Sequence, residues 1–323
     1  MKIVNLKYLW IVSAILLCTG CYKEDGKLSP SNNPEDLLSI PQGTHDYDDI
    51  IVDWYEKYGF TALYIFENKD IYWSNETWLE GGTGQMDSEI ITGNEIGTPG
   101  DQKYVGEWCD MFDRILLSHY PDNFIAKAMP FRVFICSKLL YAAVDRYSWT
   151  PEEGYKYTYE EILTYEGYDN IVVSGASAKI HSLTQEEKLT LSQGVNSYLL
   201  SRIADKELIV IPDEFFEVSV YENKNYYGVR LFENGYLNYE DINAVKSTFK
   251  KQDLISYFKL LGYPLEVLEG EPEDYVDSFL PSVQGLFNRP EGMKCKQKYD
   301  ILVKAVKDAG IKIEDIQNPS ILN

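Results

Sequence analysis

The sequence predicts an α+β fold, with a small mixed sheet, packed helices and a helical C-terminal part. Short β-branched and aromatic runs lie mainly in the first half of the 323 residues, and helical periodicity dominates the second half. Hydrophobic residues make up 45% of the chain, which is enough for a sizeable core. We expect one domain over residues 44–323, because about 280 residues fit a single large domain.

The first elements are expected to be a helix, a strand and a loop. Residues 47–58 carry apolar side chains at helical spacing, and Gly59 follows them as a helix terminator. Residues 61–66 are β-branched and aromatic, which predicts a strand. Residues 81–100 are polar and rich in glycine, which predicts a loop.

The middle of the chain predicts a helix, a buried strand and an irregular segment. Residues 107–119 have helical periodicity, which Pro121 ends, and residues 131–141 have the composition of a buried strand. Residues 147–168 are rich in tyrosine, with a short helix expected near 159–163. The alternating tyrosines within this segment also fit an edge strand.

The last third is expected to be mostly helical. A strand over residues 170–174 precedes a helix over 184–204, which Thr184 can cap. Two further helices are predicted over 241–261 and 299–308.

The N-terminus has the features of a lipoprotein export signal over residues 1–20. Lys2 and Lys7 precede a ten-residue apolar stretch, too short to span a bilayer, and a lipobox-like sequence ends at Cys21. We therefore expect cleavage before Cys21 and acylation of its sulfur, which would attach the chain to the membrane. The alternative is an ordinary secretory signal that contains cysteines.

A flexible tether is predicted over residues 21–43, because prolines stand there among polar residues. The run Tyr22-Lys23-Glu24-Asp25 resembles the surface-export signal of lipoproteins from gut Bacteroidetes. The resemblance implies an outer-membrane lipoprotein exposed at the cell surface.

The composition excludes some partners and leaves the thiols open. The formal charge of −21 argues against nucleic acid and against an anionic bilayer surface, because both would be repelled. Beyond the export signal, Cys109, Cys136 and Cys295 are an odd number without CxxC spacing. One disulfide with a free thiol and three buried thiols are both compatible with this pattern.

Three stretches carry a family resemblance. The first is residues 47–67. The second is the sequence NIVVSGAS at residues 170–177, followed by the leucine-rich helix and then by residues 210–223. The third is the tail from Glu273, which includes residues 298–317. Together they resemble the zinc-binding metallopeptidases found as Bacteroidetes lipoproteins, which are typically encoded beside outer-membrane nutrient importers. The resemblance implies a zincin-like fold.

The chain departs from that family where the family has its HExxH motif. Here the sequence is Asp213-Glu214-Phe215-Phe216-Glu217, so that only the general-base glutamate and the following phenylalanine are kept. The resemblance implies Glu214 as an inactive general base, and Asp213, Glu217 and Glu273 in metal-ligand positions.

No zinc site is expected, because the three histidines, His45, His119 and His181, are far apart in sequence. We expect no cofactor, and an oxygen-only site would suit calcium or magnesium better than zinc. The chain has 51 acidic residues, so pairs of them four residues apart, such as Asp213 and Glu217, also arise by chance. In that alternative, residues 213–217 are the solvated edge of a helix, or the segment is a strand that continues to Tyr221.

Tyrosine is frequent, with 26 residues in two clusters, one within residues 147–168 and one within 221–239. Amphipathic rings beside carboxylates can stack on sugars or hold a peptide. We single out Tyr155, Tyr157, Tyr226 and Tyr227 as candidate ligand contacts. The alternative is that these rings pack against the protein body.

These observations favour a membrane-anchored lipoprotein that acts as a non-catalytic accessory in nutrient capture. Its expected partners are a glycan or peptide ligand and outer-membrane importer components. One alternative is an active metallohydrolase with a carboxylate-only metal site, and another is a structural interaction lipoprotein.

Overall fold

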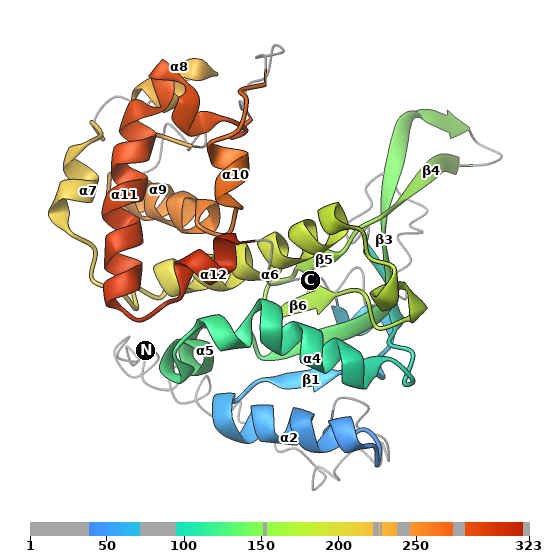
Figure 1. The fold of residues 1–323 in the computed structure, drawn as a ribbon. Helices are drawn as coiled ribbons and strands as arrows, with labels where there is room; N and C mark the ends of the chain where they lie inside the picture. The colour runs from blue at the N-terminus through green and yellow to red at the C-terminus, as the bar shows by residue number, and fades with distance from the viewer. Residues whose placement is uncertain are drawn as a thin grey trace, which may run out of the picture. The chain divides into compact units, whose positions relative to one another are not determined.

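The computed structural model describes residues 39–71, 95–150, 154–221, 226, 228–237, 246–273 and 282–318. These residues form a mixed sheet and a set of helices, so the predicted α+β class is correct (Figure 1). The predicted signal, the lipidated Cys21 and nearly all of the predicted tether lie outside the described residues. No helix in the described part of the chain is long and apolar enough to span a bilayer.

The long strand β3 (Arg132–Thr150) organises the sheet. Its first residues pair in parallel with β1 (Thr61–Leu63) on one side and with β6 (Asn170–Val173) on the other. Further along, β3 pairs antiparallel with β2 (Glu95–Pro99) and β4 (Gly154–Glu161). A short β5 (Thr164–Glu166) completes the sheet as the antiparallel neighbour of β6.

Alternation along β3 divides the core between the two faces of the sheet. Val133 and Ile135 belong to the large core that includes the helices, whereas Phe134 and Cys136 belong to a small second core. Successive strand residues point to opposite faces, so this run of buried residues serves both. The strand is therefore central and apolar here, as its composition predicted.

Local signals determine the end of one described helix and the start of another. Helix α2 (Asp46–Tyr58) ends at Gly59, which has the left-handed φ of +83° that favours glycine. Helix α6 (Gln185–Asp205) begins with a capping box, in which the Thr184 and Glu187 side chains accept from each other's backbone N–H. Both helices match the sequence prediction.

Other helices surround these. In the first half they are α4 (Val105–Ile115) and α5 (Asp122–Ala128), and in the second half α7 (Asp213–Glu217), α8 (Val229–Glu233), α9 (Lys246–Leu260), α10 (Leu265–Leu268), α11 (Met293–Asp308) and α12 (Ile313–Gln317). Helix α6 packs against α9, and α11 contacts α7, α8 and α9 (Figure 1).

Three sequence predictions were wrong in this part of the fold. The helix expected near 159–163 is absent, because residues 154–161 form strand β4. The loop expected over 81–100 ends instead in strand β2, and residues 72–94 lie outside the described residues. The α-helix expected to reach residue 119 stops at Ile115, a 3₁₀ turn follows over Leu117–His119, and Pro121 then precedes α5. Strand pairing with β3 decided the first two cases, and a proline before α5 accompanies the third.

The three described cysteines, Cys109, Cys136 and Cys295, are buried free thiols. The sequence left open either one disulfide with a free thiol or three buried thiols, and the structure has three buried thiols. Burial raises the pKa of both Cys109 and Cys295 to about 12, so these thiols are unreactive at neutral pH.

The buried His119 makes the stability of the fold depend on pH. Burial lowers the pKa of its imidazole; nearby Asp315 opposes this effect and Lys312 adds to it. A lowered pKa in the folded state means that stability is present above the ordinary pKa of about 6.5 and is lost as the pH falls. We therefore expect the free energy of unfolding to fall between pH 7.5 and pH 5, and to fall less in His119→Gln. Equal pH dependence of wild type and variant in denaturant titrations would contradict this assignment.

Candidate functional site

The acidic segment Asp213–Glu217 forms a short helix, not a strand. Helix α7 spans only Asp213–Glu217 and packs against α11. Its acidic side chains Asp213, Glu214 and Glu217 are exposed, whereas Phe215 is completely buried. The helix therefore contacts the core through its aromatic residue and presents its carboxylates to solvent.

The described side chains do not fit a zinc site. Within the described ranges, no three His, Cys, Asp or Glu residues are grouped so that they could hold a metal ion. Each histidine has its own surroundings, since His45 lies 3.2 Å from Asp48, His181 pairs with Glu107, and His119 is buried. Glu273 is exposed in the segment after α10. The roles of Asp213, Glu214, Glu217 and Glu273 remain predictions, and we derive no catalytic step through a metal.

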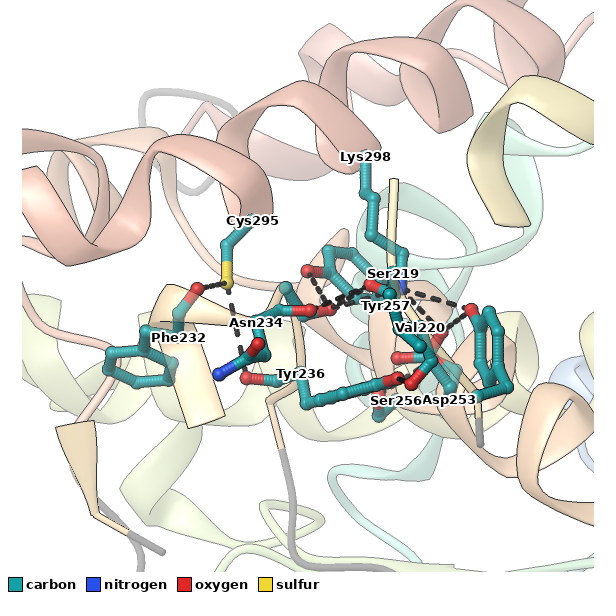
Figure 2. A network of polar contacts seen from close by, with 12 residues as sticks. Ser219, Val220, Phe232, Asn234, Tyr236, Asp253, Ser256, Tyr257, Cys295 and Lys298 are labelled. Atoms are coloured by element: carbon teal, nitrogen blue, oxygen red, sulfur yellow. Dashed lines mark hydrogen bonds and ion pairs between the residues drawn. The ribbon is translucent and has the colours of Figure 1, made fainter. Parts of the chain in front are cut away.

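A buried polar network centres on Lys298 (Figure 2), whose ammonium also contacts the Phe215 ring. The Lys298 ammonium, from α11, contacts the Asp253 carboxylate of α9 at 2.5 Å, and both side chains are fully buried. It also lies 3.0 Å from the carbonyl oxygen of Gly235 and 3.2 Å from the Ser219 hydroxyl. Tyr221 donates its hydroxyl proton to the same Asp253 oxygen at 2.5 Å.

Four aromatic rings surround the ammonium. Its nitrogen lies 4.6 Å from the ring centroids of Phe215 and Tyr257, 5.4 Å from that of Tyr236 and 5.6 Å from that of Tyr221. A desolvated cation is attracted to the negative faces of such rings. The contact with Lys298 therefore gives Phe215 a structural role that requires no metal.

Burial and pairing act in opposite directions on this pair. Burial raises the pKa of Asp253 and lowers the pKa of Lys298, and the attraction between the two groups opposes both changes. Asp253 Oδ1 has no hydrogen-bond partner among the described residues. The other carboxylate oxygen of Asp253, Oδ2, therefore accepts the hydrogen bonds from both Lys298 and Tyr221.

Sequence reasoning did not find this network, because its members are widely separated along the chain. One local signal existed: Lys298 lies three residues after Cys295 and four before Leu302, within the buried stripe of α11. A lysine at such a position needs a buried partner. Nothing in the sequence identified Asp253 as that partner.

The second tyrosine cluster is mainly core. Tyr221 and Tyr236 are 4% and 1% exposed, so these two rings pack against the protein body, as in the alternative that the sequence left open. Tyr226 is half-buried and stacks on Tyr236 with a centroid separation of 5.9 Å. Tyr227 and Tyr239 lie outside the described residues.

The first tyrosine cluster is largely exposed. We call the later part of β3 together with β4 the tyrosine hairpin; it extends from the rest of the sheet (Figure 1). Tyr147 is fully exposed and Tyr159 is 60% exposed. Tyr157 is half-buried and lies two residues from Tyr159, on the same face of the strand. Tyr155 belongs to β4, but its side chain lies outside the described residues.

Replacing Lys298 tests whether the buried pair organises this region. Lys298→Met should lower the free energy of unfolding by about 3–5 kcal/mol, because Asp253 is left buried without its cation. Replacing both partners, in Lys298→Met/Asp253→Leu, should recover part of that loss. These values are measured by urea denaturation.

Lys296→Met is the matched control, because it removes an exposed lysine of the same helix, paired with Asp300. Surface pairs contribute about 0–1 kcal/mol, so little change is expected. A Lys298→Met variant as stable as this control would show that the pair is dispensable.

Comparison with known proteins found one similar solved structure to report. No protein-family profile matches the chain, and no curated protein matches it. The solved structure is a "putative zinc-binding metallo-peptidase" from Bacteroides caccae, with 10% sequence identity and a TM-score of 0.42, covering 85% of this chain and 89% of that one. It is the kind of protein that the sequence resembles, but a likeness of this size carries no argument about chemistry.

Proposed function

We propose that this protein is an outer-membrane lipoprotein, anchored through Cys21 and exposed at the cell surface, that acts non-catalytically in the capture of nutrients. Its ligand would be a glycan or a peptide, and importer components of the outer membrane would be its neighbours. The export signal and the tether support the anchorage. The placement of the acidic motif and the tyrosine hairpin supports the binding role.

The observation that carries the proposal is the exposure of aromatic rings on the tyrosine hairpin. Large aromatic side chains are normally covered by the protein, yet Tyr147 and Tyr159 are mostly in solvent. Tyrosine gives a large and rigid contact area at a low entropy cost, and its hydroxyl adds a hydrogen bond. Such rings suit stacking on a sugar or contact with an extended peptide.

The arrangement of the donor groups supports the non-catalytic part of the proposal. Zinc-assisted hydrolysis uses an open site with three protein ligands and a water whose pKa is lowered. Here the acidic motif is on a five-residue helix with exposed carboxylates, and the histidines are engaged elsewhere or buried. A lone Glu214 has no such assistance among the described residues.

Binding to glycan and peptide arrays tests the role of the hairpin. Tyr159→Ala and Tyr147→Ala in the full chain should each weaken binding about tenfold, because removing a contact ring costs roughly 1–2 kcal/mol. Tyr168→Ala is the control, since that ring is 72% exposed but lies between β5 and β6, outside the hairpin. Wild-type protein that binds neither class would refute the capture role and favour a structural interaction protein.

Elemental analysis of the purified chain tests the absence of a metal centre. We expect no stoichiometric zinc, calcium or magnesium in the wild type, because the described residues assemble no ligand set. Asp300→Ala serves as a control for loss of an exposed carboxylate. Stoichiometric metal that disappears in Asp213→Ala and persists in Asp300→Ala would instead support the carboxylate-only metallohydrolase.

A further inference from the structure

A cavity of about 370 Å³ lies between α4, the 3₁₀ turn Ala178–His181 and the first turns of α6. Its apolar lining comes from all three elements and from the short segment before α6: Met111, Ile115, Ile180, Leu183 and Leu191. The volume lies within the range of about 300–1,000 Å³ that is typical of small-molecule sites. The cavity therefore has room for a small ligand and an apolar surface to receive it.

One face of α4 also supplies charged groups to this cavity. Asp110 and Arg114 line it, one helical turn apart, and both are exposed. The Arg114 guanidinium makes a long hydrogen bond of 3.4 Å to the Asp110 carbonyl oxygen, and within the described ranges neither side chain forms an ion pair. An acidic and a basic side chain thus line the cavity one helical turn apart, and the described residues show no ion pair between them.

Some of the other charged groups that line the cavity interact with neighbouring side chains. Glu107 pairs with His181, and the Tyr104 ring lies edge-on to His181 with a centroid separation of 5.8 Å. Lys188 adds a second cation beside Arg114. The cavity therefore offers apolar walls together with groups of both signs.

We propose that this cavity binds a short apolar peptide with both termini free, of dipeptide size. Arg114 would receive the terminal carboxylate, Asp110 the terminal ammonium, and the apolar lining the side chains. Residues one turn apart on a helix have Cβ atoms about 5–6 Å apart. The termini of an extended dipeptide are separated by about 7 Å, which longer side chains on α4 can match. This inference does not rest on the tyrosine hairpin, which lies on other elements.

Calorimetric titration of the full chain with leucyl-leucine tests the proposal. We expect binding, and at least tenfold weaker binding of N-acetyl-leucyl-leucine and of leucyl-leucine amide, since each lacks one charged terminus. Glycyl-glycine should also bind at least tenfold more weakly, because it has no side chains for the apolar walls. Octanoate separates carboxylate binding by an aliphatic chain from recognition of a zwitterion.

Two substitutions connect each terminus to its residue. Arg114→Gln should weaken the binding of leucyl-leucine about tenfold but leave the affinity for leucyl-leucine amide unchanged. Asp110→Asn should also weaken the binding of leucyl-leucine about tenfold but leave the affinity for N-acetyl-leucyl-leucine unchanged. Arg230→Gln, on helix α8, is the matched control for an exposed helical arginine. Thermal melting of each variant checks that the fold is intact.

The outcomes separate this site from the hairpin. No binding of leucyl-leucine, equal binding of the blocked forms, or tighter binding of octanoate or free leucine would overturn the assignment. Tyr159→Ala should not change the affinity for leucyl-leucine, because Tyr159 is on β4 and is not among the residues that line the cavity. Failure of the array experiment alone would therefore leave this proposal standing.

Discussion

The ion pair between Lys298 and Asp253 is the constraint on which the C-terminal helices depend. A lysine with no solvent exposure requires a carboxylate, hydrogen-bond acceptors and polarisable rings in the same place. Helices α9 and α11 supply the two charges, and the segment from Ser219 to Gly235 supplies the acceptors. A different packing of these elements would leave a charge buried and unpaired, so the pair selects one arrangement.

The same network explains one glycine. Gly235 has a left-handed φ of +76°, and its carbonyl accepts from both Lys298 and Tyr257. A Cβ at this position would stand 2.7 Å from the Ser219 hydroxyl oxygen. Both the backbone conformation and the close approach therefore require glycine.

The network also changes the interpretation of the acidic motif. Phe215, which the family resemblance treats as a companion of the general base, contacts the buried ammonium with its ring. The neighbouring carboxylates point to solvent because the helix is only five residues long and its buried side is aromatic. Packing thus accounts for Phe215, whereas the exposed Glu214 has no such role in the core.

Local signals in the sequence determined some helix ends, the buried strands and the overall class. Thr184 with Glu187 defined the start of α6, and Gly59 defined the end of α2, because capping and left-handed φ depend on a few adjacent residues. Only the tertiary structure decided that the tyrosine-rich segment pairs with β3, that Lys298 meets Asp253, and that the cavity forms beside α4. Strand pairing and buried ion pairs join residues distant in sequence, and nothing in the local pattern identifies the partner.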